Sequence, residues 1–134
     1  KPLIDRYAYH VTYNPDISKM AIAARAFAGE HDFKAFCAAG SSQITTVRKI
    51  HSVNVFEKDG DIEIVVQGEA FLYNMVRIIA GTLLEVGTVR IPAESVGDII
   101  LSGDRARAGR TLPAKGLTLE EVFYNWSEVT NKEN

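Results

Sequence analysis

Hydrophobic and polar residues alternate over residues 6–13, and a period of two predicts a β-strand. One face of this strand carries Tyr7, Tyr9, Val11 and Tyr13. From Ile17 to Gly29 the apolar residues instead recur at helical spacing, and the closing glycine suits a helix C-cap. We therefore expect the chain to begin with a strand followed by a helix.

A pair of β segments is predicted within residues 49–70, on either side of Asp59-Gly60, a dipeptide typical of two-residue hairpin turns. From Phe71 to Val86 the apolar positions return to a helical period, and Gly87 is a suitable stop. We expect a hairpin followed by a long, mostly apolar helix.

The pattern after residue 87 predicts a shorter helix at 93–101, directly after Pro92, and a final strand at 116–126. The order β-α-β-β-α-β, with one small extra helix before the last strand, is that of an α+β, ferredoxin-like split βαβ fold. We expect residues 1–126 to form one domain of this class and residues 127–134 to be a frayed tail.

Composition limits the number of domains and the cellular compartment that we expect. The chain has 134 residues, of which 46% are hydrophobic, enough for the core of a single domain. Its one cysteine, Cys37, excludes an internal disulfide and fits a reducing compartment, so we expect a cytoplasmic protein. No apolar run approaches the roughly 20 residues that cross a bilayer, which predicts no membrane partner. The start at Lys1, without a methionine, suggests an excised fragment.

A basic cluster interrupts the acidic second half of the chain, whose overall formal charge is -2. Four cationic side chains without an intervening carboxylate make up this cluster: Arg105, Arg107, Arg110 and Lys115. They predict either a phosphate-binding surface or a solvated loop, and the sequence alone leaves both open.

Arg77 lies on the long predicted helix, on the same stripe as Asn74, Gly81 and Glu85. An arginine side chain stays charged in proteins, so placing it on a largely buried helix is costly without an anionic partner. That partner is either a carboxylate of this domain or a group outside the chain. Neither alternative is excluded by the residues themselves.

Other reactive side chains carry weaker signals. His10, His31 and His51 lack the spacing of metal ligands, so no metal site is predicted. Ser41 and Ser42 have no evident base to activate them. Phe33 and Phe36, three residues apart, form either a base-stacking pair or, as we favour, part of the core.

Five segments in order resemble the C-terminal half of the tRNA pseudouridine synthase A family. They are RYAYH at 6–10, HDFKAF at 31–36, TTVRKI at 45–50, FLYNMVRIIAGTLLEVG at 71–87 and DRARAGRTLPAKGLTLEEVFY at 104–124. The resemblance implies an isomerase that converts uridine in tRNA to pseudouridine without a metal or cofactor. The family's essential aspartate, in an Arg-Thr-Asp segment, has no counterpart here, which implies a missing N-terminal domain and an inactive isolated chain.

The resemblance also implies roles for single residues. Arg77 matches the arginine that pairs with the missing aspartate, Tyr7 the tyrosine that stacks on the target uracil, and Leu117 an apolar wall of the uracil pocket. As partners it implies tRNA, contacted by the basic cluster, the N-terminal domain and, at full length, a second copy in a homodimer. Without the resemblance, Tyr7 and Leu117 would be interpreted as strand residues packed in a core.

Two other classes share this predicted topology. An RNA-binding module of RRM type is the alternative, but residues 62–70 lack the aromatic side chains that such a strand uses to stack bases. A small-molecule regulatory domain would have no reason to place Arg77 on the inner stripe of a buried helix.

Overall fold

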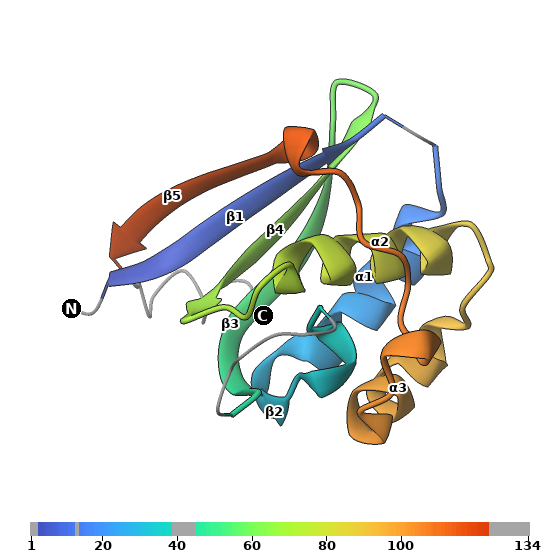
Figure 1. Ribbon diagram of the computed structural model, residues 1–134. Coiled ribbons are helices and arrows are strands. Elements are labelled where there is room, and N and C mark those ends of the chain that lie inside the picture. Colours follow the sequence, from blue (N-terminus) through green and yellow to red (C-terminus); the bar gives the residue numbers. More distant parts are fainter. Residues whose placement is uncertain (1–2, 13, 39–44, 124–134) are drawn as a thin grey trace.

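The computed structural model describes residues 3–12, 14–38 and 45–123. Along the chain its strands and α-helices are β1 (Leu3–Val11), α1 (Ile17–Ala24), β2 (Gly29–Asp32), β3 (Val47–Lys58), β4 (Asp61–Glu69), α2 (Met75–Gly87), α3 (Val96–Ser102) and β5 (Leu117–Phe123). The sheet has the order β2-β3-β4-β1-β5, and every neighbouring pair is antiparallel. In Figure 1 the helices lie together on one side of this sheet.

The strands β3, β4, β1 and β5, with α1 and α2 as connections, reproduce the ferredoxin-like order, so the predicted fold class is confirmed. The fifth strand, β2, was not predicted. It is only four residues long, Gly-Glu-His-Asp, and shows no apolar alternation. It forms because β3 is long and pairs with β2 along the edge away from β4.

The predicted hairpin is confirmed. Asp59 and Gly60 connect β3 to β4 with φ angles of 53° and 85°, and both are in the left-handed region. That conformation matches the right-handed twist of the two strands, and glycine adopts it without steric cost.

The first predicted helix is too long. Asp16 begins α1 by accepting the backbone N–H groups of Ser18 and Lys19, and its hydrogen bond from the Ser18 hydroxyl is the main cause that lowers its pKa. The α-helix ends at Ala24, and a 3₁₀ turn follows it. Gly29, with φ of 104°, starts β2 instead of capping the helix.

The second helix begins later than predicted. Residues 71–74 belong to a loop, because Ala70 and Asn74 have φ angles of 51° and 61° that a helix does not accept. The third helix starts as a 3₁₀ turn at Ala93–Ser95 and continues as α3. The predicted last strand is confirmed as β5, and the tail predicted at 127–134 lies outside the described residues.

The main core lies between the helices and the sheet. Phe33 and Phe36 are fully buried there and make an edge-to-face contact, so both pack in the core as favoured. Most of α2 is also buried, whereas Arg77 and Glu85 are only partly so. Within the described ranges, no helix combines the length and the apolar character needed to span a membrane.

Candidate active site

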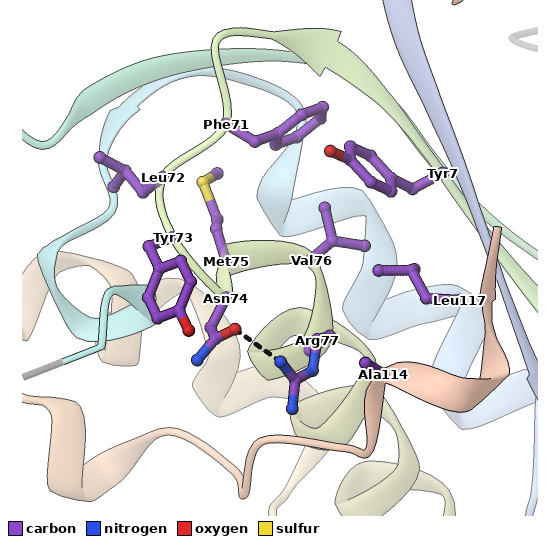
Figure 2. Close-up of a pocket in the computed structure, with 10 residues that line it drawn as sticks. All are labelled: Tyr7, Phe71, Leu72, Tyr73, Asn74, Met75, Val76, Arg77, Ala114 and Leu117. Carbon is purple, nitrogen blue, oxygen red and sulfur yellow. Dashed lines mark hydrogen bonds between the residues drawn. The ribbon is translucent and has the colours of Figure 1, made fainter. Parts of the chain in front are cut away.

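A pocket of about 380 Å³ opens where the first turn of α2 faces β1 and the start of β5. Its walls are Tyr7 of β1, residues 71–77 from the loop and helix start, and Ala114 and Leu117. Figure 2 shows Tyr7 beside Phe71, and Arg77 beside Asn74. The three side chains that the resemblance singled out, Tyr7, Arg77 and Leu117, therefore share one pocket although they are far apart in sequence.

Arg77 is held by two uncharged oxygens. Its Nη1 donates to Oδ1 of Asn74 at 2.7 Å, and its Nε donates to the carbonyl of Leu112 at 2.7 Å. Across residues 3–12, 14–38 and 45–123, no carboxylate forms an ion pair with this guanidinium, and Nη2 makes no hydrogen bond. The sequence left two possible partners for Arg77, a carboxylate of this domain or a group outside the chain. Among the described residues, no carboxylate fills the first of these roles.

Asn74 explains how Arg77 is aimed. Asparagine enters the left-handed region more readily than most residues, and here it precedes the first residue of α2. Its side chain makes no capping hydrogen bond to the helix and accepts from Arg77 instead. The positive end of the α2 dipole therefore lies at the pocket together with the guanidinium, an environment that favours an anion.

Tyr7 is partly exposed at the opposite wall. Its ring meets Phe71 edge-on, with centroids 5.3 Å apart and planes at 84°. Burial, with a smaller contribution from Asp5, raises the pKa of the Tyr7 phenol. Leu117 is also partly exposed, so both residues present a face to the pocket and are not sealed in the core.

A crossing segment, residues 109–116, lies over the predicted stripe of α2. The N–H of Gly109 donates to Thr82 Oγ1 at 2.8 Å, and the N–H of Arg110 donates to Glu85 Oε2 at 2.8 Å. The N–H of Leu112 donates to the carbonyl of Arg77 at 3.2 Å. These bonds place Ala114 and, beyond the segment, Leu117 at the pocket.

The far end of the crossing segment is held from β1. The buried Tyr9 donates its hydroxyl to the carbonyl of Pro113 at 2.5 Å. Burial raises the pKa of this phenol, and the nearby charge of Arg77 partly opposes that effect. The phenol is thereby kept as the neutral donor that this hydrogen bond requires.

Gly81 makes the crossing possible, a role that the helical pattern alone did not predict. A Cβ built at Gly81 would lie 1.7 Å from the carbonyl oxygen of Arg110, so any side chain would push the crossing segment off the helix. The signal was present, because a glycine inside an otherwise strong helical pattern often marks a close backbone approach.

We predict that Gly81→Ala destabilises the protein by roughly 2–4 kcal/mol, since backbone must move to admit the methyl group. Urea unfolding followed by circular dichroism measures this change. Gly97→Ala in α3 is the matched control: nothing lies within 4 Å of its added Cβ, so it should be neutral or slightly stabilising. Equal stability of the two variants would contradict a tight crossing.

The basic cluster divides into two parts. Arg105 is half-buried and donates from Nη1 to the carbonyl of Gly109 and from Nη2 to Thr111 Oγ1, which ties its own loop together. The other three members are exposed: Arg107, Arg110 and Lys115. Arg110 and Lys115 line a second hollow of about 670 Å³, on the Tyr9 and Leu84 side of the crossing segment.

The histidines are engaged separately. Nε2 of His10 lies 3.1 Å from Glu63, that of His51 lies 2.9 Å from Glu69, and that of His31 lies 2.8 Å from the carbonyl of Ala28. Ser41 and Ser42 fall outside the described residues.

Comparison with known proteins adds an independent finding. A family model described as tRNA pseudouridine synthase matches residues 23–125. The chain is 47% identical to tRNA pseudouridine synthase A 2 of Clostridium tetani over 124 residues, which cover 92% of the chain and 50% of that protein. It is 48% identical over 122 residues to tRNA pseudouridine synthase A of Acetivibrio thermocellus (91% and 50%), and 49% over 124 residues to that of Geotalea uraniireducens (92% and 50%).

The chain thus spans about half the length of the curated relatives it matches, and it corresponds to their C-terminal half.

Proposed function

The chain belongs to the tRNA pseudouridine synthase family, and on that premise we propose that it supplies one wall of a uridine isomerase site for tRNA. The observation that carries the proposal is the pocket shared by Tyr7, Arg77 and Leu117, in which the described residues leave the guanidinium without an acid. The nucleophilic aspartate would come from an N-terminal domain facing this pocket.

The reaction breaks the bond between N1 of uracil and C1′ of ribose, and forms a new bond between C5 and C1′. The proton on C5 leaves to solvent, and N1 gains a proton, so atoms balance without an oxidant or a reductant. The base must leave the tRNA stack to react, and the pocket has the size class of a small-ligand site.

Arg77 would hold the incoming carboxylate ionised and directed at the reacting nucleoside. Two of its nitrogens are fixed by Asn74 and Leu112, so Nη2 is presented in a defined direction for an ionic hydrogen bond. The start of α2 adds a further favourable field for the negative charge. Positioning of this kind lowers the barrier because the reacting groups no longer have to be ordered in each turnover.

Tyr7 and Leu117 would hold the extruded base. The flat phenol ring, oriented by Phe71, replaces a neighbouring base as a stacking surface, and Leu117 closes the apolar side. Their partial exposure at the pocket supports contact with a ligand, because a ring sealed in the core has no face left to offer.

The N-terminal domain would dock along β5. In the described sheet β5 is an edge strand that pairs with β1 alone, and Leu117 at its start lines the pocket. Leu119 and Phe123 on β5 and Leu3 on β1 are exposed apolar side chains near this edge.

We also propose that the full-length protein is a cytoplasmic homodimer that acts on tRNA.

A stand-alone module of RRM type is not favoured. The family match covers most of the chain, and β4, which occupies the centre of the sheet, carries no aromatic residue.

The exposed members of the basic cluster would contact tRNA phosphates, and Arg105 would contribute by fastening the loop that presents them. We predict that the double variant Arg110→Ala/Lys115→Ala weakens tRNA binding. The slope of log affinity against log salt concentration should become shallower by about one to two, because each lost phosphate contact releases about one counterion fewer. Filter binding between low and physiological salt measures both quantities. Arg90→Ala, an exposed cation outside the hollow, is the control, and an unchanged slope in the double variant would remove both residues from the tRNA surface.

The proposed function is tested with tRNA that carries tritium at uridine C5. Isomerisation replaces the C5–H bond by a C5–C1′ bond, so each turnover releases tritium into water. The full-length protein should release it, and complete absence of release on unmodified tRNA would overturn the proposal.

A further inference from the structure

The loop that carries the pocket aromatics is bounded by two left-handed residues. β4 ends at Glu69, Ala70 follows with φ of 51°, and Asn74 closes the loop with φ of 61°. Asparagine tolerates this region, whereas alanine enters it only against a steric penalty between its Cβ and the following carbonyl. Ala70 therefore needs an external contact that holds it there.

Arg48 on β3 provides that contact. Its Nε donates to the carbonyl of Ala70 at 2.6 Å, and its Nη1 donates to the carbonyls of Thr45 at 2.9 Å and Val47 at 2.7 Å. One planar guanidinium thus joins the start of β3 to the corner after β4. Such a fork fixes the corner more rigidly than a single flexible donor would.

A neighbouring contact reinforces the same corner. β3 contains a register shift between Ile50 and Ser52, and His51 at this bulge places Nε2 at 2.9 Å from the carboxylate of Glu69. Glu69 directly precedes Ala70. Two side chains of β3 therefore contact this corner: Arg48 binds the carbonyl of Ala70, and His51 binds the carboxylate of the residue before it.

The corner determines where the Phe71 ring lies. A Cβ at Gly68 would come within 2.9 Å of the tip of this ring, so the glycine leaves the space that Phe71 occupies over β4. The ring then meets Tyr7 edge-on at 5.3 Å. A continuous path of contacts runs from Arg48 through Ala70 and Phe71 to the ring of Tyr7.

We propose that Arg48 is a positioning residue of the isomerase site, acting through the Ala70 carbonyl and Phe71 to orient the stacking ring of Tyr7. The inference rests on the proposed function for its effect on turnover. Its structural part, the coupling of Arg48 to Tyr7, stands independently of that function.

The coupling is measured by NMR on full-length protein with ¹³C-labelled tyrosine rings, the Tyr7 signals being assigned with Tyr7→Phe. Phe71→Leu removes the neighbouring ring and defines the direction in which the Tyr7 ring signals shift. Arg48→Ala is expected to shift them in the same direction, and Lys49→Ala, an adjacent exposed cation on β3, to leave them in place. Unmoved Tyr7 signals in Arg48→Ala would overturn the inference and leave the proposed function standing.

The effect on catalysis is measured in the same variants. Arg48→Ala is expected to lower kcat about tenfold with tRNA affinity nearly unchanged, Arg48→Lys to lie between it and the wild type, and Lys49→Ala to match the wild type. Adding Ala70→Gly to Arg48→Ala should restore part of the loss, because glycine takes a positive φ without a clamp. A loss of tRNA affinity at constant kcat would make Arg48 a phosphate contact and overturn the proposal. Absence of tritium release from the wild type would instead refute the proposed function.

Discussion

Arg77→Ala in the full-length protein is expected to reduce pseudouridine formation by roughly 10³-fold and tRNA affinity by less than about threefold. The guanidinium meets Asn74 and the Leu112 carbonyl but no acid among the described residues, so its charge is available to a catalytic carboxylate. In the proposed function, tRNA affinity depends on phosphate contacts spread over a wider surface, which this substitution leaves in place. Tritium release measures turnover, and filter binding measures affinity.

Arg77→Lys separates charge from geometry. Lysine keeps the positive charge, but its three N–H donors share one nitrogen, so they cannot reproduce the separate, fixed positions of Nε, Nη1 and Nη2. We expect Arg77→Lys to have a turnover rate between that of the wild type and that of Arg77→Ala. Thermal unfolding must show that both variants stay folded. Equal losses of turnover and affinity in Arg77→Ala would make the arginine a structural residue of the crossing segment.

The isolated chain of 134 residues is expected to release no tritium from C5-labelled tRNA above the rate without protein. In the proposed site it contributes the charge partner, the stacking ring and the apolar wall, but its sequence contains no Arg-Thr-Asp segment that would supply the nucleophile. Supporting groups alone do not break a glycosidic bond, because nothing stabilises the developing positive charge at C1′. Full-length protein assayed on the same tRNA is the control.

A second measurement on the isolated chain keeps this prediction informative. Circular dichroism must show that the chain is folded, since an unfolded chain would be inactive for a trivial reason. Turnover by the folded chain that disappears in its Arg77→Ala variant would show that the nucleophile lies within these residues, and the proposed division of labour would then be wrong.

Hydrophobic periodicity predicted which residues of α2 share a face, but not which segment of the chain packs on that face. The spacing of Asn74, Arg77, Gly81 and Glu85 predicted a common stripe, and the structure places the crossing segment on that stripe. Which segment would cover it was not predictable, because that depends on contacts between residues distant in the chain. The need of Arg77 for a partner was clear from its charge, whereas the use of two neutral oxygens was not.

Local backbone conformations were likewise predictable only where neighbouring residues determine them. The Asp59-Gly60 hairpin was predicted because the turn is determined by the two residues that form it. The start of α2 was misplaced by four residues because Ala70 carries no sequence signal of a positive φ, and the clamp that stabilises it comes from Arg48 on another strand. β2 was missed because it exists only through pairing with β3.

Short-range patterns in the chain were enough to establish the ferredoxin-like class, the hairpin, the long apolar helix and the ordered segments of the family resemblance. The folded arrangement alone decided that Tyr7, Arg77 and Leu117 share a pocket, that Gly81 admits the crossing segment, and that Arg48 supports Ala70. The physical reason is range: turns and periodicities depend on neighbours in sequence, whereas a site and its strained supports depend on packing between segments that meet only in the folded protein.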